Sequence, residues 1–286
     1  MPRPRSAAAW LFAGAILAVC PAASGQSAEG PPPEIDQTLI NLPTTLELKA
    51  HKSYFRLTHR FARDLGQGGF GDLASDLFSL DNGAVIGLEY RFAVTSTVQA
   101  GVHRSALGKT LNTFGRWDAL RQGGRSPIGI SPMVTIEGQN NLRQDPQPGA
   151  SVTISHVVAS RLALYATPTY VHNAHTETLR LLHEGHEHAG IEQDAADLST
   201  AIDTFFLGLG ARARLLETVA LVVEAAPRLA GYAPAVASWN AAIEKTTHGH
   251  VFQLNFGNNF NTTPGMIARG GIANEVFLGF NLSRKF

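Results

Sequence analysis

The sequence has little charge, almost no cysteine and no apolar run long enough for a membrane-spanning helix. Charged residues make up 16% of the 286 residues, the formal net charge is zero, and Cys20 is the single cysteine. Soluble globular domains usually carry about 25% charged residues. A neutral chain lacks the basic field that nucleic-acid binding needs. With 44% hydrophobic residues the chain is also too apolar for a disordered protein.

Residues 1–25 have the pattern of a cleaved export signal. Two arginines precede an uncharged stretch over residues 7–20, and residues 23–25 resemble a small-residue cleavage site. The uncharged stretch is too short to cross a bilayer as a helix. Cleavage removes two arginines and no acid, so we expect a mature chain of net charge −2 without cysteine. Residues 17–20 also resemble a lipoprotein cleavage box, which leaves lipidation of Cys20 as an alternative.

Alternation with a period of two dominates the rest of the chain and is typical of β-strands. From Ala84 to Phe92 every second side chain is apolar, and the intervening positions include Glu89 and Arg91. Twelve segments share this character. They cover residues 54–62, 83–92, 97–106, 110–120, 127–137, 149–158, 161–171, 201–213, 217–226, 236–246, 249–257 and 275–286.

The connections between these segments alternate in length, as in outer-membrane barrels with short periplasmic turns and longer external loops. The connections expected to be long and external are 63–82, 138–148, 172–200, 227–235 and 258–274. Those expected to be short are 93–96, 159–160, 214–216 and 247–248. The third connection, near Leu107, is an exception, because it is shorter than the periplasmic turn that follows it.

A soluble β-sandwich also alternates polar and apolar residues. Two features favour the membrane. Segments of about ten residues match a tilted bilayer crossing. The last segment ends on Phe286 after apolar alternate positions, as in clients of the barrel insertion machinery, although Arg284 interrupts that pattern.

Several motifs resemble an uncharacterised bacterial outer-membrane β-barrel family, a domain of unknown function. They are Phe55-Arg56-Leu57-Thr58-His59-Arg60-Phe61, Leu80-Asp81-Asn82, Gly87-Leu88-Glu89-Tyr90, Gly249-His250-Val251-Phe252-Gln253-Leu254 and Gly279-Phe280-Asn281-Leu282-Ser283-Arg284. The resemblance runs from about Asn41 to Phe286. It implies an outer-membrane barrel and brings no catalytic residue.

Charged side chains of both signs are expected on the inward faces of the strands. The candidates are Arg56, Arg60, Glu89, Arg91, Glu137, Arg161, Asp203, Arg212 and Glu224. In an open lumen such charges set ion preference, and in a closed barrel they pair across strands and fill the interior. Twelve strands lie between barrels filled by side chains and barrels with a water channel.

A histidine-rich loop is the clearest candidate for metal binding. His172, His175, His183, His186 and His188 are interleaved with Glu184 and Glu187. Imidazole and carboxylate groups at such spacing bind zinc, nickel or copper. A solvated polar loop is the alternative. His183 and His186 are three residues apart with Gly185 between them, which does not match the metalloprotease motif.

Two further patterns have competing interpretations. His103 and Ser105 lie two apart on one strand, as in outer-membrane phospholipase, but their face is expected to point to the lumen. Residues 70–80, with Leu73, Leu77 and Leu80 behind Asp72, predict a short amphipathic helix that either covers the mouth or packs on the rim.

We therefore predict an all-β protein, an antiparallel transmembrane β-barrel of about 12 strands in the outer membrane of a Gram-negative bacterium. Residues 1–25 are the expected signal peptide, 26–43 a periplasmic lead-in and 44–286 the barrel. Expected partners are outer-membrane lipids and the insertion machinery, which reads the strand ending at Phe286.

Passive passage of small solutes is the leading functional hypothesis. A non-conducting binding or structural barrel, with a metal-binding loop at His183, His186 and His188, is the alternative, and an outer-membrane lipid hydrolase is a third. We expect no enzymatic activity, and no cofactor other than a divalent transition metal in that loop.

Overall fold

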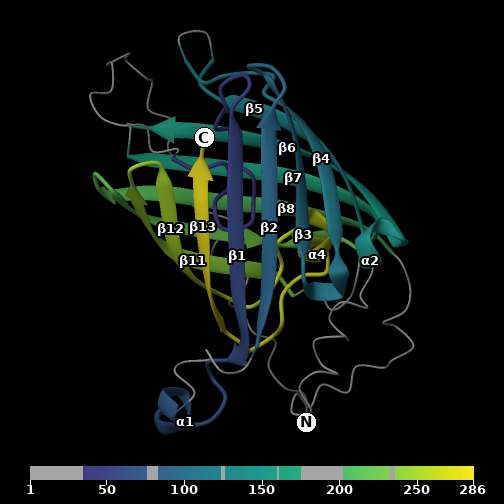
Figure 1. Cartoon of the computed structure of the whole chain (residues 1–286), viewed down its shortest axis with the longest axis vertical. Coiled ribbons are helices and arrows are strands. Elements are labelled where there is room, and N and C mark those ends of the chain that lie inside the picture. The colour runs from purple at the N-terminus through teal and green to yellow at the C-terminus, as the bar shows by residue number, and fades with distance from the viewer. Residues whose placement is uncertain (1–34, 76–82, 124–125, 160, 175–201, 232–235) are drawn as a thin grey trace, which may run out of the picture. The chain divides into compact units, whose positions relative to one another are not determined.

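Twelve antiparallel strands close into a barrel within residues 31–286, which form one compact unit (Figure 1). The computed structural model describes residues 35–75, 83–123, 126–159, 161–174, 202–231 and 236–286. Each strand pairs with its neighbours along the chain, β1 pairs with β13, and β9 pairs with both β8 and β11. The ring therefore has no free edge.

The strands of the ring are β1 (Ser53–Asp64), β2 (Ala84–Ala93), β3 (Val98–Ser105), β4 (Leu111–Trp117), β5 (Gly129–Gly138), β6 (Gln144–Val158), β7 (Leu162–Ala174), β8 (Ile202–Leu216), β9 (Val219–Ala226), β11 (Ser238–Thr247), β12 (His250–Gly257) and β13 (Phe277–Lys285). Each of the twelve predicted segments corresponds to one of these strands. The largest difference is at β6, which begins at Gln144 rather than at residue 149.

Pro227 separates β9 from a short thirteenth strand, β10 (Arg228–Ala230). Proline has no backbone N–H to donate to the sheet. The Pro227 carbonyl still accepts from Leu207 N at 3.0 Å, and β10 pairs with β8 in a shifted register. β10 therefore continues β9 past an interruption.

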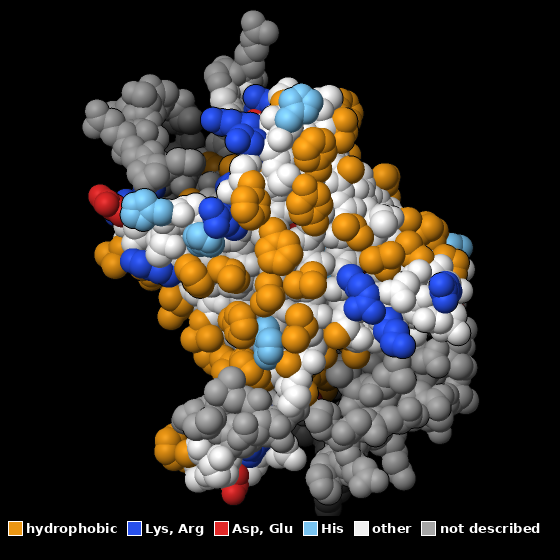
Figure 2. All heavy atoms as spheres, in the orientation of Figure 1, with side chains coloured by type: hydrophobic (Ala, Val, Ile, Leu, Met, Phe, Trp, Pro, Cys, Tyr) orange, Lys and Arg blue, Asp and Glu red, His pale blue; other side chains and the backbone are white. Residues whose placement is uncertain are grey.

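The outward side chains of the strands are apolar and exposed. Along β2 the outward positions from Ala84 to Phe92 alternate with buried inward residues, and on β5 Val134 is 64% exposed. Figure 2 shows such side chains spread over the outer face of the strands. So much exposed apolar surface is stable in lipid rather than in water.

The end of the barrel where β1 begins and β13 ends carries the connections 94–97, 159–161, 217–218 and 248–249, which are short as predicted. At the opposite end, long connections join β1 to β2, β7 to β8 and β12 to β13. By the rule for outer-membrane barrels, the first end is periplasmic and the second external. The predicted long loop at 138–148 is wrong, because the alternation of β6 continues back to Gln144 and leaves five residues, 139–143.

The described helices are short. They are α1 (Phe70–Ser75), the 3-10 turn η2 (Leu107–Lys109), α2 (Gln139–Leu142) and α4 (Pro264–Ala268). No helix among the described residues has the length and hydropathy of a membrane span. α1 begins the helix predicted over 70–80 and buries no side chain, while Leu77 and Leu80 lie outside the described residues.

Candidate functional site

The lumen of the barrel is filled by two segments of the chain. The first, residues 36–46, is named here the lumen hairpin. Leu39 N donates to Leu42 O at 2.8 Å and Thr44 N to Gln37 O at 3.0 Å, which folds the segment back on itself. The sequence assigned residues 26–43 to a periplasmic lead-in. That assignment is wrong for Asp36 to Pro43, which lie buried among inward-facing side chains.

Both ends of the lumen hairpin lie at the periplasmic end of the barrel. Ser283 Oγ, near the end of β13, donates to Asp36 Oδ2 at 2.7 Å. Arg116 Nη2, near the end of β4, donates to Leu46 O at 2.8 Å. The hairpin therefore enters and leaves through one mouth, and its tip at residues 39–42 lies deepest in the lumen.

Glu224 on β9 holds the tip of the hairpin. Its carboxylate accepts three consecutive backbone N–H groups, from Ile40 at 3.1 Å, Asn41 at 2.9 Å and Leu42 at 3.0 Å. Asn240 Nδ2 donates to the same carboxylate at 3.1 Å. A buried carboxylate is costly without partners, and three N–H groups in a row supply them.

Two arginines of β1 bind the hairpin from another part of the wall, four strands away from β9. Arg56 Nη2 donates to Ile40 O, which also accepts from Asn281 Nδ2 at 3.1 Å. Arg60 Nη2 donates to Asn41 Oδ1 at 2.9 Å, and its Nη1 donates to Asn281 Oδ1 at 2.8 Å. Both arginines are buried. Their charge-assisted bonds fix both sides of the tip.

A third set of contacts comes from β8 and β12. Arg212 Nη2 donates to Thr38 O at 2.7 Å and pairs with Glu244 at 3.0 Å. Gln253 Nε2 donates to Leu39 O at 2.9 Å and to Glu244 Oε2 at 3.2 Å. The strand side chains here act mainly as donors, and the hairpin carbonyls act as acceptors.

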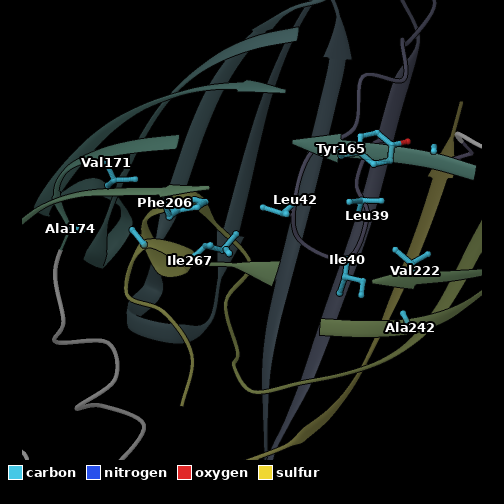
Figure 3. Close-up of a cluster of buried hydrophobic side chains, with 13 residues drawn as sticks. Leu39, Ile40, Leu42, Tyr165, Val171, Ala174, Phe206, Val222, Ala242 and Ile267 are labelled. Atoms are coloured by element: carbon cyan, nitrogen blue, oxygen red, sulfur yellow. The ribbon is translucent and has the colours of Figure 1, made fainter. Parts of the chain in front are cut away.

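The hairpin also carries an apolar side. Leu39, Ile40 and Leu42 belong to a buried cluster with Phe206 and Val222 of the wall. Figure 3 shows Leu42 on the side of Phe206, and Leu39 and Ile40 on the side of Val222. Leucine and isoleucine side chains buried in this way stabilise the hairpin by about 1.5–3 kcal/mol each.

Two glycines of β8 make room for these leucines. A Cβ built on Gly210 would overlap Leu39 Cδ1, and one on Gly208 would lie 2.8 Å from Leu42 Cδ2. Alternate positions of a strand face the same side, so the missing side chains of Gly208 and Gly210 leave a groove on the inner wall for the hairpin.

The second segment is the connection between β12 and β13, residues 258–276, named here the lumen loop. It was predicted to be an external loop. It does start and end at the external end, but residues 258–270 are almost entirely buried, and α4 lies inside the barrel (Figure 1). Asparagine and threonine side chains satisfy its backbone, for example Asn261 Nδ2 to Gly270 O at 2.7 Å.

Glu137 on β5 anchors the lumen loop. It accepts from Thr263 Oγ1 at 3.0 Å and from Gly265 N at 2.9 Å, at the start of α4. Gly265 has no side chain, and a Cβ there would overlap the Glu137 carboxylate. Glu137 therefore holds the lumen loop by accepting a backbone N–H group, as Glu224 holds the lumen hairpin.

A charged cluster on β2 and β3 connects the wall to the lumen loop. Glu89 contacts the Arg91 guanidinium, lies 3.6 Å from Arg56 Nη1 and 3.5 Å from His103 Nδ1. His103 Nε2 lies 3.1 Å from Thr262 Oγ1 of the loop. His103 therefore connects Glu89 to the loop.

The phospholipase-like pair of β3 faces the lumen. His103 and Ser105 are both buried there. Ser105 Oγ accepts from Leu107 N at 3.2 Å, while His103 contacts Glu89 and Thr262. A lipid-cleaving site would face the bilayer, so this geometry disfavours the third hypothesis.

The two inserted segments meet inside the barrel. Leu42 of the hairpin and Ile267 of α4 belong to one buried cluster. Between them and the wall remains a cavity of about 40 Å³, lined in part by Thr38, Arg91 and Thr262. Such a volume holds a few water molecules. The hairpin and the lumen loop therefore occupy much of the described lumen.

Seven of the nine predicted inward charges lie inside the barrel. Arg56, Arg60, Glu89, Arg91, Glu137, Arg212 and Glu224 are all buried. Arg161 is not, because it lies in the exposed turn before β7 begins. Asp203 is not either. It lies nine positions before inward Arg212 on β8, and an odd separation puts it on the outer face, where its carboxylate accepts from Tyr170 Oη at 2.7 Å.

Other inward polar residues were not among the candidates. They include Arg116, Asp118, Glu244, Gln253 and Asn281, all of which are buried. Strict alternation from Ile243, Leu254 and Leu282 would have identified the last three. For the lumen hairpin, the feature of the sequence that indicates burial is the apolar side chains of Leu39, Ile40 and Leu42.

The predicted metal-binding residues His183, His186 and His188 lie outside the described residues, as do His175, Glu184 and Glu187. His172 is described, on the outer face of β7, where its Nδ1 lies 2.8 Å from Asp203 Oδ1. Within the described ranges, no group of three or more histidines, cysteines or acids is close enough to hold a metal ion.

A closed antiparallel barrel of twelve strands with an apolar outer face defines an outer-membrane β-barrel. Residues 36–286 match the membrane-bound β-barrel domain family DUF5777, and the chain belongs to that family. The predicted fold class, family resemblance and outer-membrane location are thereby confirmed.

Solved structures with a similar fold include porins and an enzyme. The NanC porin has a TM-score of 0.52 and 7% identity, over 82% of this chain and 100% of that chain. The KdgM porin in complex with disordered oligogalacturonate has a TM-score of 0.49 and 8% identity, over 82% and 99%. Outer-membrane phospholipase A from Escherichia coli has a TM-score of 0.41 and 7% identity, over 82% and 90%. These likenesses concern the barrel fold alone. No curated protein matches the sequence.

Proposed function

We propose that this outer-membrane barrel is a passive passage for small solutes that the lumen hairpin closes. The observation that carries the proposal is the binding of three consecutive N–H groups of the hairpin tip by Glu224. The Glu224 carboxylate takes its hydrogen bonds from a segment that enters the barrel through one mouth. It is therefore well placed to hold that segment in the lumen in the closed state. The proposed activity involves no enzymatic step.

The position and contacts of the lumen hairpin favour its withdrawal from the lumen. Both of its ends lie at the periplasmic mouth, near Ser283 and Arg116, so it withdraws without being threaded through the barrel. Its contacts with Arg56, Arg60 and Arg212 are hydrogen bonds to oxygen atoms. Water or a solute can replace such contacts at a small net free-energy cost, about 0.5–1.5 kcal/mol for a neutral bond and more for charged donors.

A permanently closed binding or structural barrel is the second candidate. The observation that favours it is the burial of Leu39, Ile40 and Leu42 against the wall. Withdrawal of the hairpin exposes these apolar side chains, and the free-energy cost of this exposure opposes opening. The histidine-rich loop would then be a separate external feature of a sealed barrel.

Conductance in planar bilayers separates the two candidates. We compare the wild-type protein with a variant in which residues 36–44 are replaced by a glycine–serine linker of equal length. The control carries the same linker in place of the exposed external residues 66–74. The hairpin replacement is expected to give frequent stepwise conductance, and the wild type and control rare or no steps. A silent hairpin replacement that is fully inserted would favour the sealed barrel.

A further inference from the structure

The periplasmic end of the barrel carries an excess of basic side chains, which we name the basic rim. Its members are Lys49, Lys52, Arg121, Arg161, Lys245 and Arg284. The described acids that lie at this end outside the lumen are Glu47 and Glu217. Figure 2 shows basic side chains around the end at which Figure 1 marks the C-terminus.

The external end provides an internal comparison. Its described basic residues outside the lumen are Arg63, Arg104, Lys109, Arg143 and Arg228. Its described acids are Asp64, Asp72, Asp145, Asp203 and Glu275. The two signs balance there, so the excess of basic residues is a property of the periplasmic end and not of barrel rims in general.

Several members of the rim have charges that no acid neutralises. Arg121 pairs with Glu47. Lys49, Lys52, Arg161 and Arg284 are exposed, and no carboxylate among the described residues lies within ion-pair distance of them. Unpaired exposed bases of one sign attract a partner of the opposite sign.

The position of the rim identifies the partner. In the sheet register Arg284 lies opposite Phe55 of β1, and Ser53, which follows Lys52, lies opposite Phe92. The basic side chains are thus adjacent to the last apolar outward side chains, where the hydrocarbon core of the bilayer ends. Phospholipid headgroups occupy this depth, and basic residues here are attracted to anionic ones.

We propose that the basic rim binds the headgroups of anionic phospholipids in the periplasmic leaflet of the outer membrane. Lys52, which directly precedes β1, and Arg284, on the adjacent strand β13, form the centre of the site with Lys49. The site lies on the outside of the barrel and does not depend on whether the lumen opens.

Tryptophan quenching by brominated lipids tests the proposal. A Phe92→Trp, Trp117→Phe, Trp239→Phe variant places a reporter beside Lys52 on the outer face. A Trp117→Phe variant leaves the native Trp239, which is near the external end on β11. Each is reconstituted with mixtures of brominated phosphatidylglycerol and phosphatidylcholine, and the relative binding constant is measured.

At the reporter introduced by Phe92→Trp we expect phosphatidylglycerol to bind about fivefold more tightly than phosphatidylcholine, which corresponds to roughly one favourable charge contact. Lys49→Gln, Lys52→Gln and Arg284→Gln together should abolish this preference, while Arg104→Gln with Lys109→Gln should leave it unchanged. The external reporter should show no preference. Equal binding of the two lipids at the rim would overturn the proposal and would point to a soluble polyanion as the partner. A preference that survives the triple substitution would overturn it as well.

Discussion

Gly210 of β8 and Leu39 of the lumen hairpin share one space, since a Cβ on the glycine would overlap Leu39 Cδ1. Gly210→Val is therefore expected to displace the hairpin. Overpacking of this kind costs about 1–3 kcal/mol, which moves the closed state toward the open one. Single-channel recording should show more frequent opening than in the wild type.

Gly115→Ala is the control, because this glycine has room for a side chain. Gly115 lies on β4, where the nearest atom to an added Cβ is Val134 Cγ2 at 3.9 Å, an ordinary contact distance. Its conductance should equal that of the wild type. Equal conductance in Gly210→Val and Gly115→Ala would contradict a hairpin closure.

Glu224→Gln is expected to loosen the hairpin tip, because the amide removes the charge that the N–H groups of Ile40, Asn41 and Leu42 stabilise. Loss of charged hydrogen bonds costs about 1.5–3 kcal/mol each. Cys20 is the single cysteine of the sequence, so a Cys20→Ser background permits a single Leu42→Cys probe. Its rate of labelling by a thiol reagent should rise at least about tenfold in Glu224→Gln.

The control probe for this experiment is Val94→Cys, in an exposed periplasmic turn. Its labelling rate should be the same whether or not the Glu224→Gln substitution is present. If Leu42→Cys also reacts equally in both backgrounds, the carboxylate does not hold the hairpin.

Arg60→Glu is expected to shift the ion preference of the hairpin-replacement variant toward cations. Arg60 is buried in the lumen, and its described partners are amide and carbonyl oxygens, so its charge is exposed when the hairpin leaves. Reversal potentials under a salt gradient measure the preference. Arg104→Glu, on an outward-facing side chain bound to Asn141, should not shift it. Identical reversal potentials for the two variants would show that the lumen charges do not select ions.

Phe286→Ser is expected to lower the amount of assembled barrel, because we expect the insertion machinery to recognise β13 together with the Phe286 side chain that follows it. Phe286 is 55% exposed, and Trp117, also at the periplasmic end, is 56% exposed and serves as the control. The folded fraction is measured in membranes by the gel shift between unboiled and boiled samples. A loss severalfold greater for Phe286→Ser than for Trp117→Ser is expected, and equal losses would argue against recognition.

Metal binding by the histidine-rich loop remains a prediction that calorimetry can test. If it is a metal site, Zn²⁺ should bind stoichiometrically and lose affinity below about pH 6, where imidazole protonates. A His183→Ala, His186→Ala, His188→Ala variant should lose this binding. Weak heat that the triple variant does not change would leave a polar loop.

The sequence alone determined the twelve strands and which side chains of each point outward. Alternation is a local property, because successive residues of a strand point to opposite faces whatever the strand pairs with. Glu89, Arg91 and Arg212 were correctly placed inside for this reason. Asp203 lies outside because nine positions separate it from inward Arg212 on β8, and Arg161 lies outside because it belongs to the turn before β7.

What fills the lumen was decided by the tertiary structure. Residues 36–46 and 258–276 have no periodic pattern that distinguishes a segment inside a barrel from one outside it. Their location depends on contacts between residues far apart in the sequence, such as the Ile40 N–H with Glu224 and the Gly265 N–H with Glu137. An inward carboxylate appears in the sequence only as a charge on the polar face of a strand. Its partner is known once the chain has closed into a barrel and brought a second segment within hydrogen-bond distance.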